Sequence, residues 1–233
     1  MPYGLQPSTS SVVDHLYSVR VAPPSVRRGV RNFHLLYSGF EPTARTERLE
    51  AVYEAFEKDV QLRVAELATT RVFVHAGVVA IKGKAVLLPG VSMAGKTTLI
   101  AALVRAGATY YSDEYALLDR HGRVHPFLRP LSLRLPDGSR QVQRAEDLGG
   151  TNGRRPIEVG AVVMTSYRQN ARWRPRVLSP GQGVLAMMAN TAPARRQPHQ
   201  VMATLGKVAT KAIFLKGVRG EAEETAERLL ARL

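Results

Sequence analysis

Residues 90–97 read Gly90-Val91-Ser92-Met93-Ala94-Gly95-Lys96-Thr97, and this stretch determines the expected fold class. It matches the pattern G-x-x-x-x-G-K-[ST]. Its glycines let backbone N–H groups face phosphate oxygens, its lysine neutralises the β- and γ-phosphates, and its hydroxyl ligates Mg²⁺. An apolar run, Ala85–Pro89, precedes it, and Thr98–Arg105 continues as a helix whose positive end favours phosphate. We therefore expect the residues from Gly90 to Thr98 to bind a nucleotide, with ATP and Mg²⁺ as cofactors.

Two acids follow this loop at a spacing that matters for the chemistry. The run Ala108–Ser112 is predicted to be a short strand, and Asp113 and Glu114 follow it, seventeen and eighteen residues after Lys96. In a fold where this strand lies beside the strand before the loop, both carboxylates return to the phosphates. One carboxylate can then hold Mg²⁺ while the other accepts a proton from an attacking hydroxyl.

A histidine stands among apolar residues upstream of the loop. His75 lies in the β-rich run Val72–Ile81, which Lys82-Gly83 separates from Ala85–Pro89, so the two runs are predicted to form a hairpin. A histidine there can contact the γ-phosphate or orient one of the acids. Alone it would be interpreted as a core residue, but beside the loop and the acids it becomes a candidate for the site.

The histidine, the loop and the acidic pair, in this order and spacing, resemble the catalytic domain of the HPr kinase/phosphorylase family over about residues 72–120. That family is related in fold to the phosphoenolpyruvate carboxykinases. The resemblance is strongest to short HPr-kinase-related proteins of bacterial peptide-modification clusters. It implies an ATP-dependent phosphotransferase of the serine-kinase kind.

The resemblance also implies roles for single positions. Lys96 would bind the β- and γ-phosphates, and Thr97 would ligate Mg²⁺. Asp113 would be the general base that activates a serine hydroxyl, and Glu114 would help to hold Mg²⁺. His75 would lie near the transferred phosphate.

Three features depart from the family's pattern. Met93-Ala94 replaces the glycine-containing middle of the loop, and Glu114 replaces an aspartate. The C-terminal signature E-[IV]-R-G-[LIV]-G is missing, because Ile157–Ala161 only echoes it and lacks the arginine. The missing signature argues against recognition of HPr itself and against the reverse, phosphorylase reaction.

Arg134 is the candidate that would supply a cation at the transferred phosphate.

We expect an α/β fold with two parts. Residues 71–233 would form an HPr-kinase-like, carboxykinase-type P-loop core with mixed sheets and flanking helices, and residues 1–70 a small N-terminal α/β segment packed on it. In that segment Ser18–Ala22 and Asn32–Tyr37 are strand-like, and Leu49–Leu67 is an amphipathic helix that Thr46 can cap.

Further elements of the core are expected from periodicity and from turn residues. The expected strands are Tyr115–Asp119, Arg123–His125, Glu158–Thr165 and Lys211–Lys216, the expected helices are Leu185–Ala189 and Glu221–Leu233, and residues 136–156 are expected to be loop.

Composition sets limits on the class of protein. Of the 233 residues, 45% are apolar and 22% charged, as in ordinary globular proteins. The absence of cysteine excludes disulfides, thiolate metal sites and cysteine nucleophiles. No run of eighteen apolar residues predicts a membrane span, and Met1–Gln6 does not resemble a secretory signal. We therefore expect a cytoplasmic protein that does not insert into a membrane.

The formal charge of +14 lies entirely in residues 71–233, because residues 1–70 hold eight basic and eight acidic side chains. Residues 140–200 hold ten arginines, no lysine and three acids. Arginine suits phosphate and carboxylate partners, although a solvated basic surface would have the same composition. Without zinc-finger spacing or an RNP-type motif, nucleic acid is not an expected partner. The resemblance makes a homo-oligomer a further expectation.

The favoured function is a kinase that transfers the γ-phosphate of ATP to a hydroxyl, with serine of a peptide or small protein as the expected acceptor. Two alternatives remain open. One is a nucleotide-binding regulatory or scaffold protein without transfer activity, and the other is a small-molecule kinase or another nucleotide-phosphate enzyme.

Overall fold

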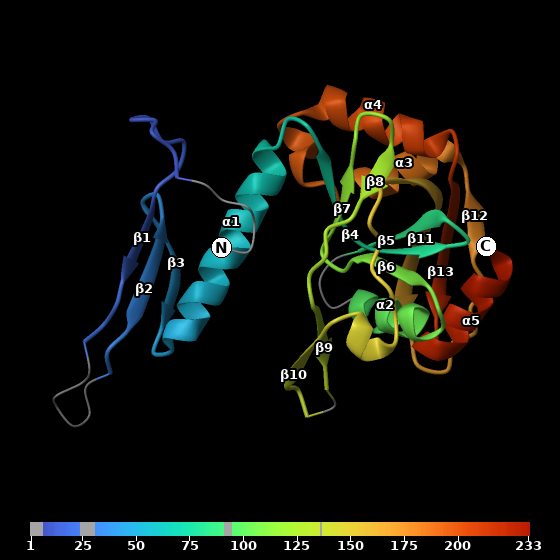
Figure 1. The fold of residues 1–233 in the computed structure, drawn as a ribbon, viewed down its shortest axis with the longest axis horizontal. Helices are drawn as coiled ribbons and strands as arrows, with labels where there is room; N and C mark the ends of the chain where they lie inside the picture. Colours follow the sequence, from blue (N-terminus) through green and yellow to red (C-terminus); the bar gives the residue numbers. More distant parts are fainter. Residues whose placement is uncertain (1–6, 24–30, 91–94, 136) are drawn as a thin grey trace. The chain divides into compact units, whose positions relative to one another are not determined.

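The computed structural model describes residues 7–23, 31–90, 95–135 and 137–233, and Figure 1 shows its ribbon. The chain divides into two compact units, residues 1–64 and residues 65–233. We call these the first unit and the second unit. The expected loop positions Val91, Ser92, Met93 and Ala94 lie outside the described residues.

The first unit holds an antiparallel three-stranded sheet and most of one helix. Its elements are β1 (Tyr17–Arg20), β2 (His34–Ser38), β3 (Glu41–Thr46) and α1 (Leu49–Leu67). The expected bounds of α1 are confirmed. Strand β3 was not expected, and its last residue is Thr46, the residue that was expected to cap α1. The Thr46 hydroxyl accepts the N–H of Arg48 at 3.2 Å. Asp59 of α1 accepts hydrogen bonds from Tyr17 and Ser38, which join the helix to the sheet.

The second unit is a mixed α/β structure around one sheet of eight strands, in the order β12-β13-β11-β5-β4-β7-β8 with β6 paired to β4. The strands of this sheet are β4 (Val72–Ile81), β5 (Lys84–Pro89), β6 (Thr109–Ser112), β7 (Tyr115–Leu118), β8 (Arg123–His125), β11 (Ile157–Tyr167), β12 (Arg176–Leu178) and β13 (Ile213–Arg219). A separate hairpin consists of β9 (Leu131–Arg134) and β10 (Arg140–Gln143). The helices are α2 (Lys96–Arg105), α3 (Pro180–Met188), α4 (Pro198–Ala209) and α5 (Ala222–Arg232), with short 3₁₀ turns η1 (Glu146–Leu148) and η2 (Ala192–Arg195).

Parallel and antiparallel pairings occur together in this sheet. Strand β11 pairs in parallel with β5 and β13, whereas β4 pairs antiparallel with β5, β6 and β7. The start of β11 also pairs with β8, so the pairing from β4 through β5, β11, β8 and β7 returns to β4. The predicted hairpin of β4 and β5 is confirmed. Its turn residues Lys82 and Gly83 both have positive φ, as a type I′ turn requires.

Helices cover both faces of the sheet (Figure 1). Alternation along β4 sends Val74, Val78 and Ala80 into a core with residues of α3 and α4. Val79 and Ile81 point to the opposite face and pack with residues of α2 and α5. His75 and Gly77, which share the odd positions of β4, therefore belong to the face that α2 covers.

The expected loop at residues 136–156 is wrong in part, because β10 and η1 lie within it. The strand β12 and the helix α4 were not expected, and α3 begins at Pro180, five residues before the expected start. A capping box explains that start, since Ser179 accepts the N–H of Gln182 and Gln182 accepts the N–H of Ser179.

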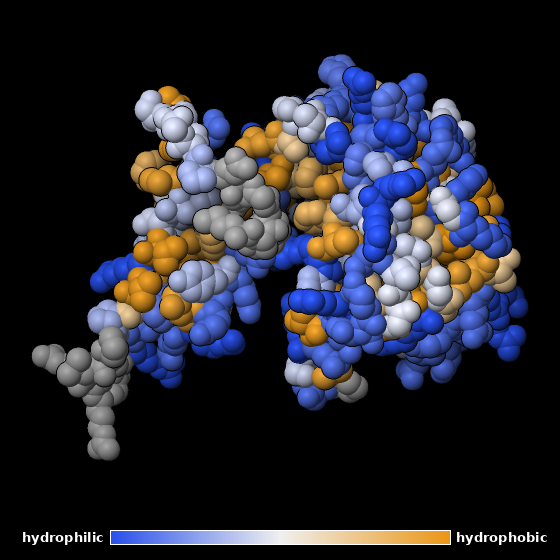
Figure 2. All heavy atoms as spheres, in the orientation of Figure 1, coloured by the Kyte–Doolittle hydropathy of each residue, from blue (hydrophilic) through white to orange (hydrophobic). Residues whose placement is uncertain are grey.

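Among the described residues, no helix combines the length and the apolar composition that crossing a bilayer requires. On the face of the second unit that Figure 2 shows, hydrophilic residues cover most of the surface, with smaller apolar areas between them.

Candidate functional site

Between β5 and α2, the structure describes two residues of the expected phosphate loop, Gly90 and Gly95. Strand β5 ends at Pro89, and Gly95 is the N-cap of α2 with φ of 76°, a backbone conformation that favours glycine. No described side chain caps this helix end, and its first turn holds no acid. The first N–H groups of a helix lack intrahelical acceptors, and the helix dipole adds partial positive charge there. This helix end is therefore suited to an anion.

Lys96 points from the first turn of α2 toward the end of β5. Its ammonium donates to the Gly90 carbonyl at 2.5 Å and lies 3.0 Å from His75 Nε2. An ammonium only donates, so a charged Lys96 needs His75 Nε2 as the acceptor of this contact. Burial lowers the pKa of Lys96, and the carboxylates of Glu114 and Asp113 oppose that shift. An anion beside Lys96 would favour the charged ammonium further.

Thr97 contacts the first of the two acids. Its hydroxyl donates to Asp113 Oδ2 at 2.8 Å. The other carboxyl oxygen, Oδ1, is buried and has no hydrogen-bond partner within the described residues. Burial raises the pKa of Asp113 to about 7, the charge of Glu114 adds to the rise, and Thr97 and Lys96 oppose it. A carboxyl group with this pKa can change protonation state near neutral pH.

Glu114, the second acid, lies near the same ring nitrogen of His75 as Lys96 does. Its carboxylate is 3.8 Å from His75 Nε2, and its side chain is about half-exposed. The Ser112 hydroxyl accepts the N–H groups of Glu114 and Tyr115, which holds the chain in a turn between β6 and β7. The two acids therefore face different partners: Asp113 faces Thr97, and Glu114 faces His75.

The middle of β4 brings these parts together. Strand β4 pairs with β7 over Val72–His75 and with β5 and β6 beyond, so its partners change beside His75. At this point the His75 N–H donates to Asn190 at 2.7 Å, and the Ala76 N–H donates to Glu114 at 3.2 Å. The Gly90 N–H donates to the His75 carbonyl at 3.4 Å. The backbone of His75 and Ala76 thus joins the start of the loop to the acidic pair.

The expected route by which the acids return to the loop is wrong in one respect. Strand β6 pairs with β4, not with β5, because β5 has β4 on one side and β11 on the other. Asp113 lies close to α2 because β4, at Gly77, packs closely against Ile100 of this helix. A Cβ there would lie 2.8 Å from Ile100 of α2 and 3.7 Å from Asp113 Oδ1. The glycine is therefore needed for the close approach of Ile100, whereas the distance to Asp113 is an ordinary van der Waals contact.

The structure thus brings His75, Gly90, Lys96, Thr97 and Asp113 together, with Glu114 beside His75. Thr98 lies exposed in the first turn of α2.

Arg134 is on β9, opposite Arg140 in the separate hairpin, and its role at a transferred phosphate stays a prediction.

Sequence reasoning missed one residue at this site. Arg219 ends β13, is 2% exposed, and donates from Nη2 to the Gly95 carbonyl at 2.8 Å. The contact spans 124 residues of sequence, and no local pattern indicates it. The one available signal is an arginine at the end of a strand that is otherwise rich in apolar residues.

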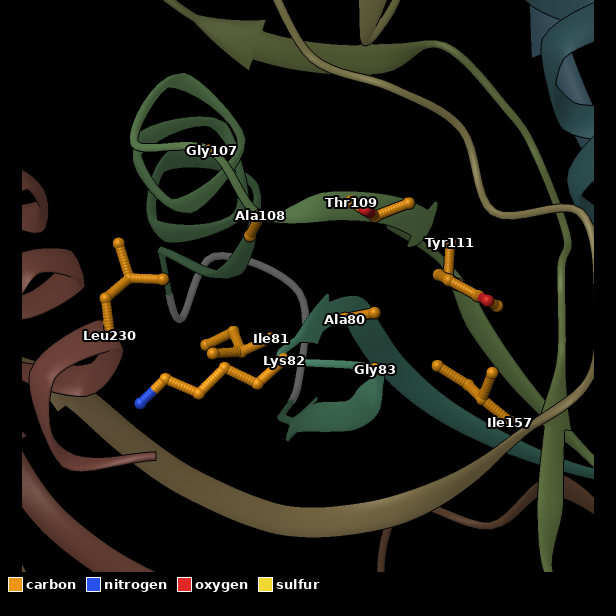
Figure 3. A pocket seen from close by; sticks show the side chains of 10 residues that line it. All are labelled: Ala80, Ile81, Lys82, Gly83, Gly107, Ala108, Thr109, Tyr111, Ile157 and Leu230. Atoms are coloured by element: carbon orange, nitrogen blue, oxygen red, sulfur yellow. The ribbon is translucent and has the colours of Figure 1, made fainter.

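A cavity of about 360 Å³ lies elsewhere in the second unit (Figure 3). Lys82 and Gly83, at the turn that begins β5, are among its lining residues, together with Gly107, Tyr111 and Leu230. The candidate site lies where β5 ends, at the far end of that strand from the cavity. None of the site residues described above lines the cavity.

No model of a known protein family matches the chain, and no curated protein matches it. Among solved structures, the chain is similar to the HPr(Ser) kinase/phosphatase from Coxiella burnetii, with 14% identity and a TM-score of 0.40. The match covers 69% of this chain and 93% of that one. A match with so low a TM-score supports neither the fold nor the function, and the proposal below rests on the site itself.

Proposed function

We propose that this chain is an ATP-dependent kinase that transfers the γ-phosphate to a hydroxyl, with serine of a peptide or small protein as the acceptor. The observation that carries the proposal is the hydrogen bond between Thr97 of the G-K-T sequence and Asp113, a carboxyl group whose pKa burial raises to about 7. Phosphoryl transfer needs phosphate binding, charge neutralisation and a group that accepts the hydroxyl proton.

The nucleotide phosphates would bind at the start of α2. The first N–H groups of α2, which no described side chain caps, and the Lys96 ammonium supply donors and positive charge there. The present partner of Lys96, the Gly90 carbonyl, is neutral, so phosphate oxygens would be stronger acceptors. His75 holds the ammonium from the other side at 3.0 Å and limits its orientation.

Residues of the site fit Mg²⁺, which prefers oxygen ligands and keeps several waters. The Thr97 hydroxyl, the half-exposed Glu114 carboxylate and the Asp113 carboxyl with its unpartnered Oδ1 are such ligands. The described residues contain no group of three or more His, Cys, Asp or Glu that would form a protein cage for a metal. That is compatible with an ion that takes its other ligands from phosphate and water. When bound, Mg²⁺ would neutralise charge on the phosphates.

Asp113 is the proposed general base. The acceptor oxygen forms its bond to the γ-phosphorus while the bond to the β-phosphate oxygen breaks, ADP leaves, and the hydroxyl proton passes to the carboxylate. A base is most effective when its pKa lies near the operating pH, and burial raises that of Asp113 to about 7.

Titration calorimetry and labelled ATP test the proposal together. ATP with Mg²⁺ should bind the wild type, and Lys96→Ala should abolish this binding while the circular dichroism spectrum stays unchanged. The matched control is Lys216→Ala, an exposed lysine on β13. Retained ATP affinity in Lys96→Ala would contradict the phosphate site.

With [γ-³²P]ATP and the peptides encoded beside the gene, label on a peptide that disappears with Asp113→Asn supports the kinase. ATP binding without any transfer would instead indicate a regulatory or scaffold protein. ADP release without an acceptor would indicate another nucleotide-phosphate enzyme.

A pair of variants separates the roles of the two acids, because Thr97 contacts Asp113 and not Glu114. If Asp113 is the base and Glu114 a metal ligand, Asp113→Asn loses transfer but keeps Mg²⁺-dependent ATP affinity, and Glu114→Gln loses that dependence. The reverse pattern would exchange the two assignments.

A further inference from the structure

Arg219 is a buried cation at the end of β13, next to the start of α2. It is 2% exposed, and its guanidinium donates to two backbone carbonyls, to Gly95 through Nη2 and to Gly220 through Nη1, both at 2.8 Å. Its Nε is buried and has no hydrogen-bond partner in the part of the chain that the structure describes.

The charge of Arg219 lacks a direct carboxylate partner among the described residues. Its nearest aromatic neighbour is Tyr167, whose ring centroid lies 5.3 Å from the guanidinium carbon. The Glu221 carboxylate accepts the Tyr167 hydroxyl at 3.0 Å. Burial lowers the pKa of Arg219, and the charges of Glu221, Tyr167 and Glu223 oppose that shift. Because none of the described carboxylates bonds the guanidinium directly, an anion near the start of α2 would further stabilise its buried charge.

The contact between Arg219 and Gly95 leaves no room for a side chain at position 95. A Cβ on Gly95 would overlap Nη2 of Arg219, and φ of 76° at this residue independently favours glycine. Gly95 directly precedes Lys96 and Thr97, and its carbonyl also accepts the N–H of Leu99 as the first bond of α2. The position of the Gly95 carbonyl therefore determines where the first turn of α2 begins.

We propose that Arg219 is a positioning residue for polyphosphate: it fixes the Gly95 carbonyl so that Lys96 and Thr97 face the acids, and its buried charge is compensated when a polyphosphate binds at the start of α2. This inference rests on the nucleotide site proposed above. It adds a cation that the G-x-x-x-x-G-K-T sequence does not contain, supplied by the C-terminal part of the chain. Arg219 acts through Gly95 and through its charge, and it need not touch the nucleotide.

The test compares Arg219→Met, Arg219→Lys and a matched control, Arg228→Met. Arg228 also donates to a backbone carbonyl, that of Trp173, but it is half-exposed and pairs with Glu224. Inorganic pyrophosphate and ATP, each with Mg²⁺, are titrated by calorimetry, and the rise in melting temperature on adding pyrophosphate is measured for each variant.

Arg219→Met should weaken both ligands by about 10- to 100-fold, the range expected for losing one charge-assisted interaction. It should also remove most of the pyrophosphate-induced rise in melting temperature. Arg219→Lys keeps the positive charge but loses the planar guanidinium that donates to both carbonyls. Its loss of affinity should therefore lie between that of the wild type and that of Arg219→Met. Arg228→Met should bind as the wild type does.

A melting temperature that falls in Arg219→Met while both affinities and the pyrophosphate response stay at wild-type values would overturn the inference, because that result describes a purely structural arginine. If Arg219→Met does not fold, Arg219→Lys decides, and wild-type affinity in that variant overturns the inference in the same way. Failure of the wild type itself to bind either ligand would overturn the proposed function along with the inference.

Discussion

The Thr97 hydroxyl donates a 2.8 Å hydrogen bond to Asp113 Oδ2, which joins the first turn of α2 to the turn after β6. The two residues are sixteen positions apart in the sequence, with a helix and a strand between them. Burial raises the pKa of Asp113 to about 7, and this contact opposes the rise, because a hydrogen bond to the charged form of an acid lowers its pKa.

Thr97→Val should therefore raise the pKa of Asp113 above its value of about 7, because the lowering hydrogen bond is lost while burial remains. The same change should weaken Mg²⁺-dependent ATP binding by about 10-fold or more, the usual effect of losing one good polar contact. A carbon-detected NMR titration of the Asp113 carboxyl measures the first effect and calorimetry the second. Thr210→Val, at the exposed end of α4, is the control and should change neither quantity.

The raised pKa of Asp113 predicts a pH-dependent stability for the protein without ligand. The folded protein holds the proton up to about pH 7, whereas the unfolded chain releases it near pH 4. The contribution of Asp113 to the unfolding free energy is therefore complete below about pH 4 and is lost as the pH rises through about 7.

Asp113→Asn should accordingly be more stable than the wild type by roughly 1–3 kcal/mol at about pH 8, and no more stable at about pH 4. Urea unfolding at both pH values measures the difference. An equal difference at the two pH values would contradict the raised pKa.

Gly77→Ala should destabilise the second unit by about 1–3 kcal/mol, because the new methyl group overlaps the Ile100 side chain. Adding Ile100→Ala should recover part of this loss by making room on α2, although that change alone opens a cavity in the core. A double-mutant cycle by urea unfolding measures the coupling. Gly181→Ala is the control, because a Cβ at Gly181 meets no neighbouring atom.

A separate prediction concerns the turn between β7 and β8. Asp119 is buried there and accepts hydrogen bonds from the backbone of His121 and Arg123 and from the side chains of Arg123 and His125. Although burial opposes the shift, these bonds lower the pKa of Asp119 to about 2. The stabilisation is present above about pH 4 and is lost as the pH falls through about 2.

Asp119→Asn should reduce the unfolding free energy at neutral pH by about 2–3 kcal/mol, as expected for hydrogen bonds to a charged group. The deficit should shrink as the pH approaches about 2. ATP affinity should stay unchanged, since Asp119 has no contact with Lys96 or Thr97 among its described hydrogen bonds. A changed affinity would show that this turn is coupled to the site.

Local patterns in the sequence were sufficient to predict the centre of the second unit. The β-branched run of β4, the Lys82-Gly83 turn and the apolar run of β5 predicted a hairpin, and the glycines before Lys96 predicted the start of α2. These are short-range signals, because each depends on residues that are neighbours in the chain.

Long-range relationships were not accessible in the same way. The pairing of β6 with β4 and the contact of Arg219 with Gly95 depend on which strands become neighbours, and sequence periodicity does not determine strand order. The helix α4 was not expected, and it begins at Pro198, because proline is well tolerated in the first turn of a helix. The roles of Asp113 and Glu114 depend on which of them faces Thr97, which spacing alone did not distinguish.

The change of partners at the middle of β4 has a consequence for hydrogen exchange. The amides of His75, Ala76 and Gly90 donate to three segments: the Asn190 turn, the acidic pair and β4 itself. Hydrogen-bonded amides such as these exchange when the surrounding structure opens. A ligand that tightens the loop end should slow their exchange together, while amides near the Lys82-Gly83 turn keep their rates. These three backbone protons would then report occupancy of the site without any label on the ligand.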